Sequence, residues 1–364
     1  MNDRFFSTCD LGGGRSIDGM LQRCLFSTLF LLTCVFALGQ RVRDIEFYGS
    51  QMKAEEALAL EASLRARPDD EISRVQLYSY YSRKYQDPEA EKSRLQHALW
   101  LIEKAPRLEV HRTLYISFDP EKNEAPFKQA RDLWTAHIEK NGDDLAILEH
   151  GGLFLLRSDP DAARELFLRG QKAEPEEPRW PNHLGRIDLR TMNIFKENPD
   201  KQKQLAAQAF ESFVRSYELS NLGGRTLLLP RLCQTALRSE QYALAEEYAN
   251  RMLSQEGAGP FGYQKNHYHG HTVLGVLKFM AGDIDEARRL LMRSLELPPS
   301  SRAMTSEPDF SLVRRFIERG DGETAAMFFK ACEDVWEKGQ SRLRDWQEML
   351  ENGETLVLEH AGMY

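Results

Sequence analysis

The sequence has little cysteine, and the positions of its cysteines exclude the paired-thiolate motifs of zinc-binding proteins. Five cysteines occur in 364 residues, and three of them fall within the first 34 positions. No two cysteines are separated by two residues, so the paired-thiolate spacing of structural zinc sites is missing. Cys233 and Cys332 fall on predicted helices where a small buried residue fits. We predict that both are core thiols, and the sequence leaves open whether they form a disulfide.

The sequence also lacks the local motifs of common enzyme classes. It contains no Gly-x-Ser-x-Gly nucleophile turn, no phosphate-binding Gly-x4-Gly-Lys-Ser/Thr loop and no His-Glu-x-x-His zinc motif. A Ser/His/Asp set assembled from distant positions stays open, but no pattern nominates one. The sequence therefore predicts a protein that is not an enzyme and needs no cofactor.

Positive charge is in short supply. The chain has 48 lysines and arginines against 56 aspartates and glutamates, which gives a net charge of −8 at pH 7. No long basic run contradicts this balance, so the chain as a whole has no electrostatic attraction for nucleic acid or anionic lipid. We expect no nucleic-acid partner, and no membrane contact beyond an uncleaved N-terminal segment.

Residues 1–39 have the pattern of a targeting segment. Arg23 precedes an apolar run from Leu25 to Leu38, and small residues flank Leu38. A run of about fourteen residues is short for a membrane span, so a cleaved signal peptide is favoured over an anchor. The stretch before Met20 is long and glycine-rich for a leader, which leaves open a translation start at Met20. We expect an exported protein, periplasmic or secreted.

Beyond residue 50 the sequence predicts helices almost throughout. The alternation of apolar and polar residues that is typical of a half-buried strand is missing. Several helix starts combine a side-chain acceptor at the N-cap with proline at the first helical position. These pairs are Asp87-Pro88, Asp159-Pro160 and Asn198-Pro199, and Asp283 begins an acidic version of the capping box.

One stretch, residues 271–299, contains the pattern of a complete helical hairpin. Gly275 and Ala287 are small residues placed where two helices touch, Gly282 breaks the chain between the helices, and Pro299 ends the unit. The whole unit is about 34 residues long, which is the length of a tetratricopeptide repeat.

The chain resembles tetratricopeptide repeat proteins over most of residues 69–338. The unit at 143–176 matches the hairpin at 271–299 position by position, with Ala163 and Phe167 in its second helix. The resemblance implies an all-α solenoid, a right-handed superhelix of about six helix pairs. The predicted units are 69–106, 143–176, 178–219, 226–257, 268–300 and 306–338.

Additional helices are predicted around these units. Residues 40–68 contain an N-terminal helix, another helix lies around 126–139, and residues 339–364 form a capping helix and a tail. The stretches 269–275 and 320–336 also resemble exported bacterial repeat proteins, a resemblance that implies no activity.

The resemblance assigns the first helix of each unit to the concave groove. Three arginines then share one stripe of an acidic protein, and we expect them to bind a protein or peptide partner through carboxylates. A solvated face whose arginines pair with nearby acids is the alternative. The candidate groove residues are Arg179, Asn182, Arg186, Leu189, Arg190, Gln234, Arg238, His269, Thr272, Val276 and Phe279.

Three histidines within five residues invite a metal-binding interpretation. On a helix only His267 and His271 share a face, while His269 points elsewhere, and no nearby carboxylate completes the set. We therefore predict no metal site. The predicted function is a non-enzymatic interaction scaffold. The alternatives are a structural component of envelope assembly that uses its edges or convex face, and a ligand- or metal-binding module at His267–His271.

Overall fold

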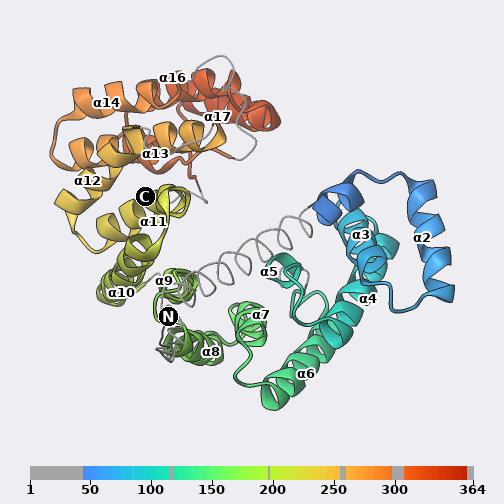
Figure 1. Cartoon of the computed structure of the whole chain (residues 1–364). Helices are drawn as coiled ribbons and strands as arrows, with labels where there is room; N and C mark the ends of the chain where they lie inside the picture. Colours follow the sequence, from blue (N-terminus) through green and yellow to red (C-terminus); the bar gives the residue numbers. More distant parts are fainter. Residues whose placement is uncertain are drawn as a thin grey trace, which may run out of the picture. The chain divides into compact units, whose positions relative to one another are not determined.

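The computed structural model describes residues 44–84, 86–114, 118–195, 197–254, 260–296 and 307–358. Within these ranges the chain forms helices joined by short turns, and no strand is present (Figure 1). The predicted all-α fold is confirmed. The predicted signal peptide lies outside the described residues. No helix in the described ranges is long and apolar enough to cross a membrane.

The helices follow the predicted order along the chain. After a short helix at 44–51 come α2 (Ala54–Ala66), α3 (Glu71–Ser82), α4 (Pro88–Lys104), α5 (His111–Leu114), α6 (Glu124–Lys140), α7 (Leu145–Leu155), α8 (Pro160–Ala173), α9 (Arg179–Met192), α10 (Pro199–Leu219), α11 (Leu222–Arg238), α12 (Tyr242–Leu253), α13 (Pro260–Met280), α14 (Ile284–Arg293), α15 (Ser311–Glu318), α16 (Gly322–Glu333), the 3-10 turn η3 (Glu337–Gly339) and α17 (Gln340–Glu351).

The helix starts follow the capping chemistry that the sequence predicts. The side chain of Asp159 accepts a hydrogen bond from the main chain of α8, and Asn198 and Asp283 do the same for α10 and α14. Each acceptor satisfies one of the main-chain N–H groups that a helix leaves unpaired in its first turn. The predicted N-caps are therefore confirmed.

The chain divides into two compact units, residues 1–154 and 155–364. In unit 1, α2 packs on α3, α3 on α4, and α4 on α6. Its interior includes Leu77, Leu101 and Trp134, none of which is more than 2% exposed. The division falls inside the single repeat domain predicted for 69–338, whose limits stay a prediction.

Unit 2 is a stack in which each helix from α8 to α14 packs on the next. Alternate helices also touch: α11 contacts α13, α13 contacts α15, and α14 contacts α16. This combination is what stacked helical hairpins produce, because each pair covers the apolar face of its neighbour. The two remaining cysteines, Cys233 and Cys332, lie buried and unbridged in this core.

Close helix contacts in unit 2 depend on residues without side chains. A Cβ atom at Gly170 would lie 2.6 Å from the Trp180 ring, and one at Gly185 would lie 2.8 Å from Cε1 of Phe213. Real Cβ atoms do not approach ring carbons so closely, so α8 can meet α9, and α9 can meet α10, only where glycine stands.

Candidate partner-binding pocket

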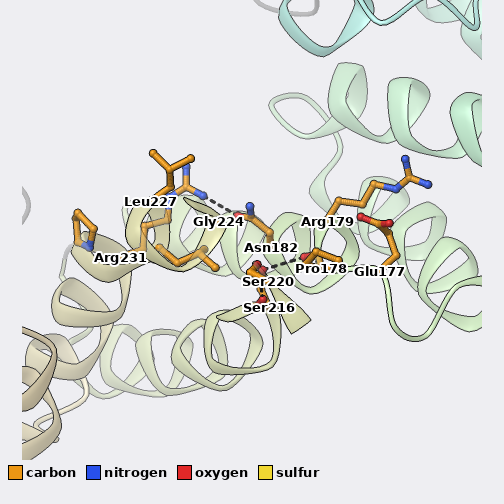
Figure 2. Close-up of a pocket in the computed structure, with 11 residues that line it drawn as sticks. Glu177, Pro178, Arg179, Asn182, Ser216, Ser220, Gly224, Leu227 and Arg231 are labelled. Atoms are coloured by element: carbon orange, nitrogen blue, oxygen red, sulfur yellow. Dashed lines mark hydrogen bonds between the residues drawn. The ribbon is translucent and has the colours of Figure 1, made fainter. Parts of the chain in front are cut away.

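A pocket of about 580 Å³ lies between α9, α10 and α11 of unit 2 (Figure 2). Its walls come from the start of α9, the end of α10 and the first half of α11. Its lining residues are Glu177, Pro178, Arg179, Asn182, Ser216, Ser220, Gly224, Leu227, Leu228, Pro230 and Arg231.

Hydrogen bonds between helices fix the shape of this pocket. The Ser216 hydroxyl donates to the carbonyl of Pro178 at 2.9 Å, which ties the end of α10 to the start of α9. Asn221 accepts a hydrogen bond from the main chain of Gly224 at 2.9 Å and so begins α11 at the pocket. The end of α10 is therefore fixed to the start of α9, and the first turn of α11 is capped at the pocket.

Arg231 and Asn182 meet inside the pocket. Nη1 of Arg231 donates to Oδ1 of Asn182 at 2.6 Å, and the guanidinium lies 5.6 Å from the centre of the Phe213 ring. Figure 2 shows this bond crossing from α11 to α9. An arginine held by an amide and an aromatic ring has a defined orientation, so its remaining N–H groups have fixed directions.

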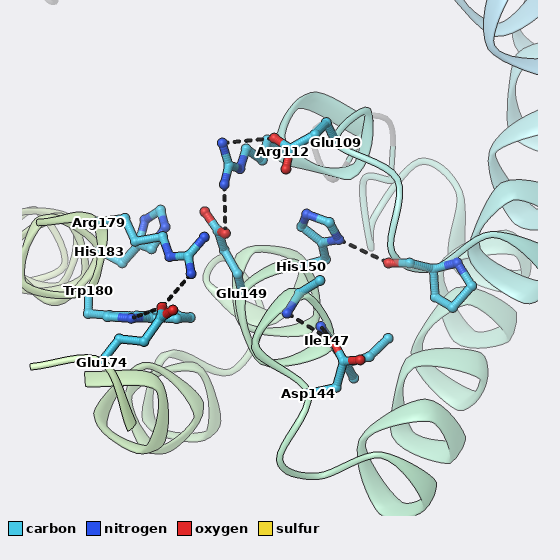
Figure 3. A network of polar contacts seen from close by, with 12 residues as sticks. Glu109, Arg112, Asp144, Ile147, Glu149, His150, Glu174, Arg179, Trp180 and His183 are labelled. Atoms are coloured by element: carbon cyan, nitrogen blue, oxygen red, sulfur yellow. Dashed lines mark hydrogen bonds and ion pairs between the residues drawn. The ribbon is translucent and has the colours of Figure 1, made fainter. Parts of the chain in front are cut away.

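Arg179, the second arginine of the pocket, is also held in place. Its Nη2 donates to Oε2 of Glu174 at 2.6 Å, and its guanidinium lies 4.7 Å from the centre of the Trp180 ring (Figure 3). The side chain is 26% exposed. The ion pair offsets part of its charge, and the ring fixes its position.

The rim of the pocket is apolar. Leu227 is 78% exposed, although the side chain beside it, Leu228, is buried. A large aliphatic side chain held on a helix next to positioned arginines is the kind of anchor that protein interfaces use. The pocket therefore offers an aliphatic contact and cationic groups within one surface.

The structure brings together only some of the predicted groove residues. Arg179 and Asn182 line the pocket, whereas Arg186 contacts Nδ1 of His183 at 3.3 Å and Arg190 is exposed near the end of α9. Arg238 donates to Sδ of Met192 at 3.9 Å, and burial lowers its pKa. The other two predicted residues on these helices, Leu189 and Gln234, are half-buried.

The predicted residues on α13 lie largely in the interior. Thr272 is 1% exposed and donates its hydroxyl to the carbonyl of Tyr268 one turn earlier. His269 and Val276 are also buried, and Phe279 packs edge-on against Phe316 at 5.1 Å. The burial follows from contacts of α13 with α11, α12, α14 and α15, which cover most of its faces. These residues therefore offer little surface to a partner in this structure.

Sequence reasoning missed several residues that define the pocket. Arg231, Leu227, Ser216 and Ser220 were not predicted, because a fixed set of repeat positions was applied to helices whose lengths differ. The one signal that could have drawn attention to Arg231 is its place directly after Pro230, a proline inside helix α11.

The histidines of α13 form a pair without further metal ligands. The rings of His267 and His271 lie 4.6 Å apart, and Nε2 of His267 donates to the carbonyl of Arg293 at 3.1 Å. Burial lowers the pKa of His271 to about 4. No group of three or more His, Cys, Asp or Glu side chains in the described part of the chain could hold a metal ion.

Comparison with solved structures identifies a similar fold. Human IFIT1, solved as a dimer with m7Gppp-AAAA, shares 15% identity over 81% of this chain and 67% of its own, with a TM-score of 0.51. A tetratricopeptide repeat protein from Parabacteroides merdae shares 15% identity over 76% of this chain and all of its own, with a TM-score of 0.41. No protein-family model and no curated protein matches the sequence. At this identity the likeness concerns the fold alone, and the chain has the fold of a tetratricopeptide-like helical repeat protein.

Proposed function

We propose that this chain is a non-enzymatic interaction scaffold that binds a segment of a partner protein in the α9–α11 pocket. The fold supports this proposal, because stacked helical hairpins present extended surfaces suited to binding. The observation that carries it is the convergence of α9, α10 and α11 on one cavity. Asn182 and Arg231 meet there although 49 positions separate them in the sequence.

The chemistry of the pocket favours a particular kind of segment. Arg231 supplies a positioned guanidinium suited to a carboxylate, and Leu227, one turn earlier on α11, supplies an aliphatic contact beside it. The expected partner segment therefore has an acidic residue next to an aliphatic one. IFIT1 was solved with m7Gppp-AAAA, but the net charge of −8 and the presence of Glu177 in this pocket favour a peptide here.

The proposed place of action is outside the cytoplasm. The support is the apolar run Leu25–Leu38, which follows Arg23 as in secretory signal peptides. N-terminal sequencing of the protein recovered from the producing cells tests this, since cleavage is expected to leave Gln40 or a close neighbour as the first residue.

A peptide-selection experiment tests the pocket. Displayed random peptides are selected on the purified chain, and the dissociation constants of enriched peptides are measured by fluorescence anisotropy. Leu227→Asp is expected to weaken binding at least tenfold, about 1.4 kcal/mol, because it places a carboxylate on the apolar rim. Leu58→Asp on α2 is the matched control, since Leu58 is 68% exposed and lies outside the pocket.

Two results would contradict the proposal. One is a set of selected peptides whose affinity is unchanged by Leu227→Asp while both variants melt at the wild-type temperature. The other is tight binding of a capped RNA oligonucleotide to the purified chain without enrichment of any peptide.

A further inference from the structure

Three histidines from three helices of unit 1 hold the end of α4. They come from α5, α6 and α7, and each ring nitrogen donates to a main-chain carbonyl within residues 102–106. We call these side chains the histidine clamp. Its bonds run from Nε2 of His111 to Ala105 at 3.0 Å, from Nε2 of His137 to Ile102 at 2.8 Å, and from Nδ1 of His150 to Pro106 at 2.9 Å.

These donors reach carbonyls at a buried helix end. The last carbonyls of a helix have no partner within the helix, and Ala105 and Pro106 are buried, although the Ala105 carbonyl also accepts from the main chain of Leu108 at 3.1 Å. Figure 3 shows the bond from His150, which crosses from α7 to the turn after α4. The clamp therefore provides hydrogen bonds to the carbonyls at the end of α4, as a C-cap does, through side chains from three later helices.

Two members of the clamp lie deep in the interior. His111 and His150 are each 1% exposed, and their ring centres are 5.4 Å apart. Trp134 of α6 packs edge-on against both, at 5.1 Å from His111 and 6.4 Å from His150. These imidazoles are therefore surrounded by apolar and aromatic groups.

The hydrogen bonds fix the neutral form of His111. Its Nε2 must carry the proton, because its partner is a carbonyl, so Nδ1 carries the lone pair. Nδ1 is buried and makes no hydrogen bond within the described residues. A second proton at Nδ1 would therefore bring a positive charge and an unpaired N–H group into a dry site.

Within the described residues, carboxylates on or beside the helices of the clamp have partners of their own. Glu46 accepts from the hydroxyl of Thr113 on α5 at 3.2 Å, and burial raises its pKa. Glu149 on α7 accepts from Nη2 of Arg112 at 3.0 Å, and Arg112 also pairs with Glu109 at 2.8 Å (Figure 3). The other charged groups at the turn after α4 and at the start of α7 are paired as well. They are Lys104 with Glu103, and Arg107 with Asp144.

Burial is the largest influence on both imidazoles. It lowers the pKa of His111 to about 3, helped by the neighbouring His150, and it lowers the pKa of His150 below its ordinary value. In the unfolded chain both groups return to 6.5. The unfolded form therefore binds more protons below about pH 6.5, so the stability that the clamp provides above that pH is lost as the pH falls.

We propose that the histidine clamp is an acid-sensitive latch that releases the end of α4 from α5, α6 and α7 when the surroundings become mildly acidic. The His111 imidazole alone favours the open form about tenfold at pH 5.5 relative to pH 7.5, and the buried His150 imidazole adds to this in the same direction. A third buried imidazole, His97, bonds to Glu61 elsewhere in unit 1 and adds its own dependence, which the variants below leave unchanged.

Hydrogen exchange followed by mass spectrometry tests the latch on the full chain. Opening constants are measured from pH 7.5 to 5.5, after correction for the intrinsic exchange rate. The wild-type protein is expected to show a rise of at least about tenfold in α4–α6.

The matched variant keeps both hydrogen-bond donors and removes the two imidazoles that bind protons. His111→Gln places an amide N–H near the position of Nε2, and His150→Asn places one near Nδ1. The double variant is expected to lose at least about tenfold of the rise in α4–α6 between the two pH values, whatever its stability at pH 7.5. His267→Gln in unit 2 is the control and is expected to leave the rise intact.

The proposal is overturned if the double variant retains the wild-type pH dependence in α4–α6. Where the double variant does not fold, NMR of the wild-type chain with carbon-13-labelled histidine decides. In that case the rings of His111 and His150 must stay neutral in the folded protein at pH 5.5, and titration of either above that pH removes the latch.

Discussion

At the scale of single residues, a buried carboxylate in unit 2 forms an ion pair with an arginine of the neighbouring helix. Asp188 on α9 is 2% exposed and accepts from Nη2 of Arg164 on α8 at 2.5 Å. Burial raises the pKa of Asp188, and the bond to Arg164 opposes that rise. Removing the arginine would leave a carboxylate in the core without its cation, which costs more than the pair contributes.

Arg164→Met is therefore expected to lower the free energy of unfolding by about 3 kcal/mol at pH 7, at the lower end for buried pairs because Arg164 is 35% exposed. A folded-state pKa above the unfolded value means that the folded form binds the proton more readily. The loss relative to wild type should shrink as the pH falls from 7 toward 5. Urea unfolding of the wild type and the variant at pH 7 and pH 5 measures this loss in the free energy of unfolding.

The double variant Arg164→Met with Asp188→Leu is the control for this pair. It is expected to recover most of the loss, because two apolar side chains replace the pair. A double variant as unstable as Arg164→Met, or a loss that does not change with pH, would show that Asp188 is not the source of the cost.

Some residue roles were predictable and others were not. The sequence indicates small residues such as Gly275 where helices touch, but it does not show that Trp180 fills the space over Gly170. Likewise, Arg179 and Asn182 were placed on the binding surface from their spacing, whereas Arg231 was missed. Contacts across 49 positions depend on how helices of unequal length settle against one another, which spacing within one unit does not determine.

At the scale of elements, four helices end in the same way. In each, the residue just after the last turn lies in the left-handed region. The N–H group of that residue donates to the carbonyl three positions earlier, and the N–H group of the next residue donates to the carbonyl five positions earlier. Three of these residues are glycines, whereas the fourth, Glu240 with φ 61°, is not. They are Glu240 after α11, Gly282 after α13, Gly320 after α15 and Gly353 after α17.

This comparison predicts unequal effects of exchanging the residue type at the two helix ends. Gly282→Ala forces a side chain into the left-handed region with nothing nearby to compensate, so it should destabilise unit 2 by about 1 kcal/mol. Glu240→Gly should cost less than that or be neutral, because relief of strain offsets the lost exposed contact with Lys203. Thermal melts of both variants measure the difference, and equal destabilisation by the two would contradict this explanation.

Helix starts whose capping residue was used in the prediction were placed well, and the others were not, although α11 also begins at a cap, Asn221. The starts of α4, α8 and α10 fall on the predicted prolines, Pro88, Pro160 and Pro199. The starts of α11 and α13 precede the predicted units, at Leu222 and Pro260, because repeat length was used there instead of a cap. Helix α11 also continues through Pro230, which a sequence rule would take as a break.

At the scale of the whole molecule, the repeat pattern predicted the fold class but not its division. Residues 69–338 were expected to form one continuous repeat domain, whereas contacts cluster into two units that separate within α7. Repeat stacks are stabilised by contacts between neighbouring repeats, so a place with few such contacts divides the stack into units. No single sequence motif marks such a place. The predicted groove residues on α13 are buried for a related reason, since the extent of stacking around a helix is a property of the assembled unit.

The division into two units predicts that a destabilising substitution in one unit raises hydrogen exchange only in that unit. Gly151→Leu inserts a side chain where a Cβ would already lie 3.0 Å from Ile138, and Gly275→Leu inserts one against Leu312. Each should destabilise its surroundings by about 1–3 kcal/mol through overpacking. Hydrogen exchange is expected to rise in α3–α6 for Gly151→Leu and in α12–α15 for Gly275→Leu.

The matched control for both variants is Gly223→Leu at the exposed start of α11, where a Cβ meets only the Asn221 side chain at 3.6 Å. It should leave exchange unchanged in both units. If Gly151→Leu and Gly275→Leu each raised exchange to the same extent along all described helices, the chain would unfold as one cooperative body. Neighbour coupling would then extend across the division, and an acid-sensitive event confined to unit 1 would not be physically available to this protein.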